Sequence, residues 1–316
     1  MKIVLMEPLG ISQDKLEELS GFLTQAGHSF FAYPDRATDP QKLAARIGDA
    51  EILILANQPL REDVLRQCPN LRMISIGFTG VDHVDVDYCK SRGIMLSNAS
   101  GYSTNAVAEL AFGLMIAVSR KVIACDQATR TGKDKTGLIG FELAGKTLGI
   151  VGTGAIGLKT AEIGKAVGCR VVAYSRSQRP EALAMGLEYL PLETLLQESD
   201  IVSLHVPATP ATKGLINASR LSLMKPSAIL INTARGPVVD SQALATALRT
   251  GQIAGAGLDV FDTEPPLPAD QPLRDCPNTV VTPHVAFATQ QSMVKRAIIV
   301  FDNVRQWLNG TPINQI

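Results

Sequence analysis

The chain has 316 residues, of which 46% are hydrophobic and 19% are charged, a composition typical of a folded globular protein and not of a disordered chain. Its length predicts two domains, because one hydrophobic core rarely serves so long a chain. The 30 Lys and Arg residues balance 30 Asp and Glu residues, so no overall positive field exists to attract nucleic acid or an anionic membrane.

The first hundred residues alternate short apolar runs with amphipathic segments. Strand-length runs occur at residues 2–6, 29–33, 51–56, 72–77 and 93–98. The segments between them have helical patterns, such as the one that Ser12 caps. Strands that alternate with helices predict parallel pairing, here in a doubly wound sheet of the flavodoxin-like type.

Residues 103–121 predict a long helix that is apolar nearly all round. Such a helix is normally buried between layers or against another subunit, which suggests a homodimer. A second series of strand runs follows and predicts a second parallel sheet, at residues 147–152, 170–174, 200–206, 228–234, 254–260 and 279–285. A last helix, at residues 288–308, is expected to pack back on the first domain.

A G-x-G-x-x-G string links the first strand of the second series to a helix pattern that starts near Ile156. Gly152 permits the tight turn, Gly154 lets the backbone approach a pyrophosphate, and Gly157 lets the helix pack closely on the strand. The pyrophosphate would lie at the helix N-terminus, around Ala155. The string predicts a Rossmann dinucleotide-binding site, with a purely structural turn as the alternative. We therefore expect an α/β fold with a cleft between two doubly wound domains: a substrate-binding domain of residues 1–100 plus 288–316, and a dinucleotide-binding domain of residues 101–287.

The strand after this helix, at residues 170–174, is followed by Ser175, Arg176 and Ser177, and no acid lies between Glu162 and Glu181. An NAD site usually places a carboxylate at this point to bind the ribose 2′-hydroxyl, and that carboxylate would repel the 2′-phosphate of NADP. Arg176 can pair with the 2′-phosphate, and the two serines can donate to it. The alternative is an arginine that simply faces solvent. The segment favours NADP over NAD.

Three further strings follow strand ends: INTARG (231–236), LDVFDTEPP (258–266) and TVVTPHVAFAT (279–289). With GFTGVDHVD (77–85) and SNASGYSTNAVAE (97–109), they make the chain resemble the D-2-hydroxyacid dehydrogenase family, in particular its glyoxylate/hydroxypyruvate reductases. The resemblance spans nearly the whole chain. It implies an NAD(P)-dependent 2-hydroxyacid dehydrogenase that reduces a small 2-keto acid to the 2-hydroxy acid.

The resemblance places the family's catalytic residues at Arg235, Glu264 and His284. Arg235 would bind the carboxylate and carbonyl oxygen of the keto acid. His284 would donate a proton to that oxygen as hydride arrives, and remove it in the reverse direction. Glu264, hydrogen-bonded to the other ring nitrogen, would favour the imidazolium.

Other positions are implied by the resemblance alone. Asp259 would contact the nicotinamide carboxamide, and the backbone of Phe78, Thr79 and Gly80 would receive the substrate carboxylate. The positions expected to line the cofactor are Thr104, Val206, Pro207, Thr212, Thr233 and Ala234. His83 and His205 are expected to be structural, because His284 already fills the acid/base role.

Two other functions stay open. One is an NAD-linked member of the family that acts on 3-phosphoglycerate, phosphite or a larger 2-keto acid. The other is a cofactor-sensing corepressor or scaffold. Many relatives carry a Trp in the loop that corresponds to residues 130–143, and some use it to close the substrate pocket. This chain has none there, so the sequence does not define the substrate.

The five cysteines are far apart and never in a CxxC spacing, so we expect free thiols in a reducing cytoplasm and no metal site. The chain begins with a strand pattern and not with a charged and then apolar leader. Its most apolar stretch, residues 106–118, is too short to span a membrane. The expected partner is therefore a small 2-keto or 2-hydroxy acid, with no nucleic acid and no membrane.

Overall fold

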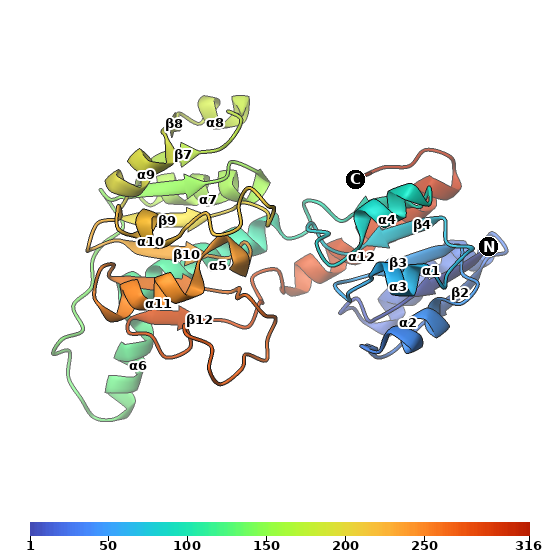
Figure 1. Ribbon diagram of the computed structural model, residues 1–316, viewed down its shortest axis with the longest axis horizontal. Helices are drawn as coiled ribbons and strands as arrows, with labels where there is room; N and C mark the ends of the chain where they lie inside the picture. Colours follow the sequence, from blue (N-terminus) through green and yellow to red (C-terminus); the bar gives the residue numbers. More distant parts are fainter. The chain divides into compact units, whose positions relative to one another are not determined.

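A computed structural model describes residues 1–316 and divides them into two units (Figure 1). Unit 1 consists of Met1–Ser103 and Ala288–Ile316, and unit 2 is Thr104–Phe287. Each unit is built on one sheet in which every strand pair is parallel. The predicted fold class, two parallel-sheet α/β domains, is confirmed. None of the helices has the length and apolar character needed to cross a membrane.

Unit 1 has five strands in the order β2-β1-β3-β4-β5, the flavodoxin-like arrangement. Each strand lies inside a predicted run: β1 (Lys2–Leu5), β2 (Ser29–Ala32), β3 (Ile52–Leu55), β4 (Met73–Ile76) and β5 (Met95–Asn98). The helices are α1 (Gln13–Gln25), α2 (Pro40–Ile47), α3 (Glu62–Leu65), α4 (Val86–Ser91) and α12 (Gln290–Leu308).

Helix α12 comes from the far end of the chain and joins unit 1 through buried polar contacts. The Ser75 hydroxyl donates to the Val300 carbonyl oxygen at 2.9 Å. The Asn303 side-chain amide donates to the Asn98 carbonyl oxygen at 3.0 Å. These hydrogen bonds join the helix to β4 and to the end of β5. Unit 1 is therefore built from two segments that are far apart in the sequence.

Unit 2 has seven strands in the order β12-β11-β10-β9-β6-β7-β8. The order reverses between β6 and β9, and in such sheets ligands bind at this switch point. The strands are β6 (Thr147–Val151), β7 (Arg170–Tyr174), β8 (Glu188–Tyr189), β9 (Ile201–Leu204), β10 (Ile229–Asn232), β11 (Gly255–Leu258) and β12 (Thr279–Val281). The helices are α5 (Thr104–Ser119), α6 (Val122–Arg130), α7 (Ala155–Ala166), α8 (Pro180–Ala184), α9 (Leu192–Glu198), α10 (Ala218–Leu221) and α11 (Ser241–Arg249).

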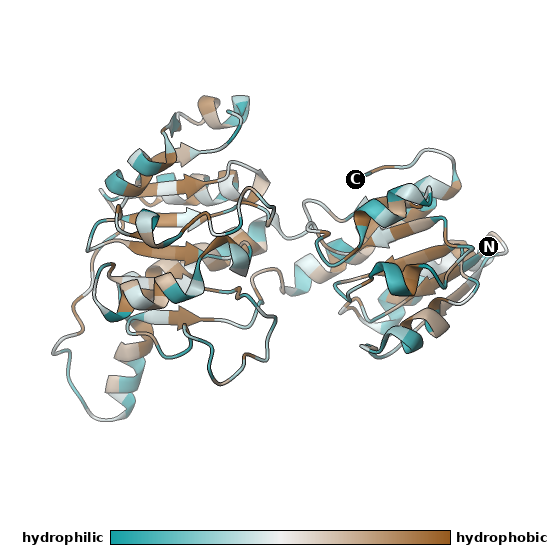
Figure 2. Cartoon of the chain, in the orientation of Figure 1, coloured by the Kyte–Doolittle hydropathy of each residue, from teal (hydrophilic) through white to brown (hydrophobic).

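The strands of unit 2 are apolar without alternation because both faces of the sheet are covered. In β10, Ile229 and Ile231 pack into the core layer that also contains Leu114 and Met115 of α5. Leu230, between them, packs into the opposite layer, which α9 and α11 help to form. Figure 2 shows the strands of both units as largely hydrophobic ribbons, as expected for a sheet that lies between two layers of helices.

Unit 2 differs from the predicted elements in several places. The strand predicted at residues 279–285, for example, ends at Val281, as β12. The predicted helix 103–121 stops at Ser119, because Lys121 adopts a left-handed conformation with φ 52°, and the separate helix α6 follows. The edge strand β8 was not predicted, since two residues carry no periodic signal.

Candidate active site

The turn after β6 has room only for glycine at two of the three glycine positions of the G-x-G-x-x-G string. Gly152 has φ 102°, and a Cβ there would lie 2.5 Å from the His205 carbonyl oxygen. A Cβ on Gly157 would lie 2.0 Å from the Gly152 carbonyl oxygen. A Cβ on Gly154, by contrast, would meet no protein atom within 4 Å. The protein itself therefore does not require glycine at 154, whereas a ligand that approaches this backbone closely would.

Helix α7 begins at this turn with Gly154 as its N-cap, so no side chain caps the first turn. Its first N–H groups, around Ala155 and Ile156, have no partner within the helix. Together with the helix dipole they form a site for an anion at the switch point of the sheet. The turn thus fits the pyrophosphate of a dinucleotide.

The segment after β7 reaches the same end of the sheet. The Gly152 N–H donates to the Tyr174 carbonyl oxygen at 2.7 Å, which joins the end of β7 to the glycine turn. Ser175 is half-buried, whereas Arg176 and Ser177 are exposed. No hydrogen bond or ion pair engages the Arg176 guanidinium. This side chain is therefore available to a phosphate group.

Other predicted cofactor-lining residues follow neighbouring strands of unit 2. Thr233 lies just after β10, is 7% exposed, and its hydroxyl has no hydrogen-bond partner in the protein. A buried hydroxyl without a partner is unfavourable unless a ligand satisfies it. Thr212 closes a turn by donating to the Pro207 carbonyl oxygen at 2.5 Å. The remaining positions, Val206 after β9, Ala234 after β10 and Thr104 at the start of α5, are half-buried.

The structure joins His284 and Glu264, two residues that lie twenty positions apart. The His284 Nδ1 atom is 2.8 Å from the Glu264 Oε2 atom and 3.0 Å from its Oε1 atom. The His284 side chain is mostly buried, at 16% exposure, whereas that of Glu264 is 68% exposed. Because Nδ1 is engaged by the carboxylate, Nε2 is the ring nitrogen left for a substrate oxygen.

Arg235 lies on a turn that is stabilised by the buried side-chain amide of Asn232. The Asn232 side chain donates to the Arg235 carbonyl oxygen at 3.0 Å and accepts from the Ala234 N–H at 3.0 Å. A Cβ on Gly236 would lie 1.9 Å from the carbonyl of Phe261, so the loops after β10 and β11 are in close contact there. This contact brings the Arg235 turn beside the loop that leads to Glu264. The sequence analysis did not identify Asn232, although it lies within the INTARG string.

Asp259 organises the loop that carries His284. It is fully buried, and its carboxylate accepts from the Thr282 hydroxyl at 2.5 Å and from the N–H groups of Val285 and Ala286 at 2.9 and 2.8 Å. Burial raises the pKa of Asp259, and these hydrogen bonds oppose that rise. The sequence analysis proposed only a nicotinamide contact for this residue and missed its contacts with the loop.

The predicted substrate loop belongs to unit 1 and is described within it. Phe78 is buried after β4, with its ring 6.0 Å from the Tyr102 ring and 5.3 Å from the Arg296 guanidinium. Thr79 is exposed, and its carbonyl oxygen accepts from the Asn98 side chain at 2.9 Å. Gly80 follows and is half-buried. The loop thus has a buried apolar residue at its base and an exposed residue beside it, and its role in substrate binding stays a prediction.

The chain is similar in sequence and in fold to known proteins. A family model described as the NAD binding domain of D-isomer specific 2-hydroxyacid dehydrogenases matches residues 112–286. The chain is 40% identical over 286 residues to a glyoxylate reductase of Korarchaeum cryptofilum, covering 88% of this chain and 86% of the relative. It is 40% identical over 297 residues to a glycerate dehydrogenase of Methylorubrum extorquens, covering 92% of each chain.

Two solved structures share the fold over nearly the whole length. An acyclic imino acid reductase in complex with NADPH and D-Arg superposes with a TM-score of 0.91 at 30% identity, covering 100% of both chains. A D-lactate dehydrogenase from Aquifex aeolicus, complexed with NAD and lactic acid, has a TM-score of 0.86 at 30% identity and covers 98% of this chain and 96% of that one.

Proposed function

The chain belongs to the D-isomer-specific 2-hydroxyacid dehydrogenase family, whose members are nicotinamide-dependent oxidoreductases, and we propose that it reduces glyoxylate or hydroxypyruvate with NADPH. The observation that carries the chemistry is the hydrogen bond between His284 and Glu264, whose loop lies next to that of Arg235. The curated relatives above, a glyoxylate reductase and a glycerate dehydrogenase, support the substrate class.

In this proposal His284 is the general acid and base. Glu264 holds the ring through Nδ1 and stabilises its positive charge, so that Nε2 presents a proton to the carbonyl oxygen of the keto acid. Arg235 binds the substrate carboxylate and polarises the same carbonyl group. When bound, the nicotinamide supplies the hydride that reduces the carbonyl carbon. In the reverse direction His284 removes the proton from the 2-hydroxyl group.

The proposed preference for NADP is supported by the end of β7. Arg176 has no protein partner, the serines at 175 and 177 flank it, and no carboxylate lies there to bind a ribose 2′-hydroxyl. The alternative is NAD, which the Aquifex enzyme binds. An NAD-linked enzyme would leave Arg176 facing solvent.

A panel of turnover assays tests the proposal. Oxidation of NADPH and NADH is followed in parallel with glyoxylate, hydroxypyruvate, pyruvate, 2-ketoisocaproate and phenylpyruvate. Fastest turnover of glyoxylate or hydroxypyruvate with NADPH supports both parts of the proposal. Turnover with NADH alone refutes the cofactor preference, and a clear preference for phenylpyruvate or 2-ketoisocaproate refutes the substrate class.

We also propose that the protein is a homodimer that associates through unit 2. Helix α6 has no buried residue, and large apolar side chains are exposed on it and on the following loop: Val122 at 44%, Ile123 at 51% and Ile139 at 84%. The loop is held near the end of α5, because the Phe141 N–H donates to the Ser119 carbonyl oxygen at 3.1 Å. An exposed apolar surface of this kind marks a contact with another protein.

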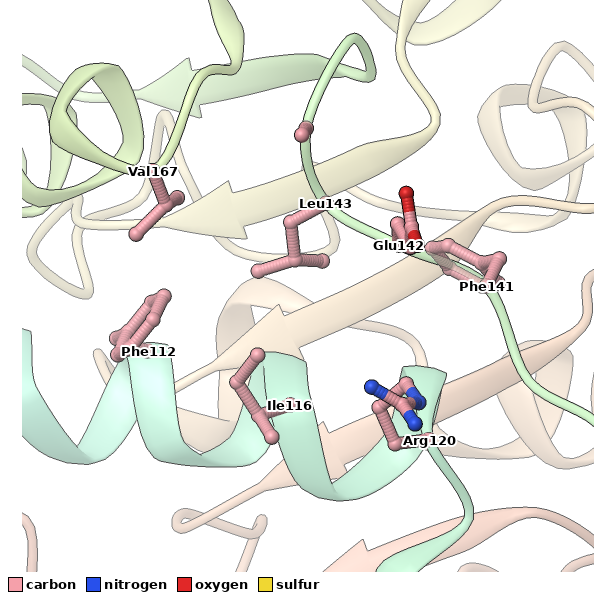
Figure 3. A pocket seen from close by; sticks show the side chains of 8 residues that line it. Phe112, Ile116, Arg120, Phe141, Glu142, Leu143 and Val167 are labelled. Carbon is pink, nitrogen blue, oxygen red and sulfur yellow. The ribbon is translucent and has the colours of Figure 1, made fainter.

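An apolar groove lies beside this loop. Figure 3 shows Phe112 and Ile116 of α5 pointing toward Leu143 and Val167 across it. A second copy would place its own exposed apolar side chains against this surface, as the twofold symmetry of most dimers allows. We expect a dimer in sedimentation analysis and a shift toward monomer in Ile139→Asp. A monomeric wild-type chain would refute this association.

A cytoplasmic location is proposed from the cysteines. All five are free, and burial raises the pKa of Cys68 and of Cys89 to about 11, so these thiols stay protonated and unreactive. Free buried thiols are usual in reducing compartments. Fractionation of the native cells tests this, since recovery in an extracytoplasmic fraction would contradict it.

A further inference from the structure

A tyrosine on the edge strand β8 connects the two loops of the proposed cofactor site. The Tyr189 hydroxyl accepts from the Arg179 backbone N–H at 3.0 Å, and it donates to the Thr153 hydroxyl oxygen at 2.9 Å. Thr153 lies between the first two glycines of the turn after β6, and Arg179 ends the segment that follows β7. One hydroxyl group therefore joins the pyrophosphate loop to the loop that carries Arg176.

The segment after β7 has few other restraints. No hydrogen bond engages a side chain of residues 175–178, and Arg179 begins α8 without a side-chain cap. The Tyr189 ring, by contrast, packs against the apolar core layer of unit 2, and its strand pairs with β7 through Ala173. The hydroxyl is thus carried by a ring that packs on the core and by a strand paired with β7, and it provides the hydrogen bond that attaches the segment.

The direction of these hydrogen bonds leaves the hydroxyl proton of Thr153 available to a ligand. A backbone N–H can only donate, so Tyr189 accepts a hydrogen bond from Arg179, and its own O–H donates one to the Thr153 hydroxyl. Thr153 is 1% exposed, and its hydroxyl proton has no acceptor in the protein. A buried donor without an acceptor is costly, and the turn in which it lies is the predicted phosphate site. A phosphate oxygen would satisfy it.

We propose that Tyr189 is a positioning residue of the cofactor site. It fixes the segment of residues 175–179 relative to the glycine turn, and so sets the distance between the bound pyrophosphate and the guanidinium that meets the ribose 2′-phosphate. Through Tyr189, the Thr153 hydroxyl is oriented to donate to the pyrophosphate. This inference rests on the cofactor role proposed above for the two loops.

Tyr189→Phe tests the inference because it removes both hydrogen bonds and keeps the packed ring. Dissociation constants of NADPH and NADH are measured by calorimetry, without substrate, together with the melting temperature. We expect NADPH to bind about tenfold more weakly, as loss of one or two hydrogen bonds implies, and NADH, which loses only the orientation of Thr153 toward the pyrophosphate, to change by less than about threefold. Tyr33→Phe, which removes a hydroxyl bonded to the Arg46 carbonyl oxygen in unit 1, is the matched control and should change neither constant.

Thr153→Val breaks the same chain of hydrogen bonds from its other end. It should weaken both cofactors, because the pyrophosphate is common to them. In that background Tyr189→Phe should add less than about threefold to the NADPH constant, since coupled residues are not additive. Independent, additive effects of the two substitutions on the NADPH dissociation constant would overturn the inference. So would a Tyr189→Phe variant whose NADPH constant is unchanged, or one that binds NADPH and NADH equally more weakly than the wild type. Tighter binding of NADH by the wild-type protein would instead refute the proposed NADP preference, a separate result.

Discussion

The His284 backbone N–H donates to the Asp259 carbonyl oxygen at 2.8 Å, at a position where His284 adopts a left-handed conformation with φ 55°. Only a few per cent of non-glycine residues adopt this conformation, with Asn, Asp and His the most frequent among them, so the surrounding contacts help to hold it. The Asp259 carboxylate supplies them by accepting from the side chain of Thr282 and from the N–H groups of Val285 and Ala286. A single buried aspartate thus fixes both sides of the loop that orients the proposed acid.

Asp259→Asn should therefore impair catalysis through the position of His284. The amide has one acceptor oxygen, so at least one backbone N–H of the loop would face a second donor. Misplacement of a catalytic group by about 1 Å can reduce the rate about 100-fold, and we expect a loss of kcat of this order. Steady-state assays check it, with Asp240→Asn, an exposed helix cap, as the control for an aspartate change elsewhere in unit 2. An unchanged kcat in Asp259→Asn would show that the loop that carries His284 keeps its conformation without the Asp259 carboxylate.

His284→Asn should separate catalysis from cofactor binding. Asparagine tolerates a positive φ, so the backbone of the loop is retained while the proton donor is lost. We expect kcat to fall about 100- to 10,000-fold, the usual contribution of a general acid, with the NADPH dissociation constant within about twofold of wild type. Stopped-flow assays and calorimetry measure the two quantities. Equal loss of both would mean that His284 has a structural role.

Features of this fold that depend on residues close together in the sequence could be predicted, whereas those that depend on contacts between distant residues could not. The strands of unit 2 could be predicted because residues such as Ile229 and Leu230 are buried on opposite faces, which gives continuous apolar runs. The glycine turn could be predicted because the clash that excludes a side chain at Gly157 involves the nearby Gly152 carbonyl. Both signals are local in the chain.

The residues that support the site could not be predicted in the same way. Tyr189 contacts Thr153, 36 positions away, and Asp259 contacts Ala286, 27 positions away. No local pattern distinguishes such a tyrosine or aspartate from one that only packs or faces water. Helix α6 was also not predicted: it begins just after Arg120 and Lys121, which follow the end of α5, and it buries no residue.

Arg176→Ala should change cofactor preference more than any other property. If the guanidinium pairs with the 2′-phosphate, its loss removes a charge-assisted hydrogen bond and weakens NADPH about 10- to 100-fold, with little effect on NADH. Dissociation constants of both cofactors are the measurement. Arg66→Ala, which removes an exposed positive charge from unit 1, should leave both unchanged. An unaltered NADPH/NADH ratio in Arg176→Ala would refute the phosphate contact.

His205 should make the protein sensitive to acid. Its Nε2 lies 2.9 Å from the Ser203 hydroxyl, and burial lowers its pKa from 6.5 to about 4. Between these two values the unfolded chain binds a proton that the folded protein does not, so stability falls as the pH decreases from 6.5 to about 4. The loss is up to about 3 kcal/mol, because one pKa unit corresponds to about 1.4 kcal/mol. His205→Gln lacks the titrating group and should lose less stability over this range in urea unfolding followed at several pH values. Parallel pH profiles for the two proteins would show that His205 is not the group responsible.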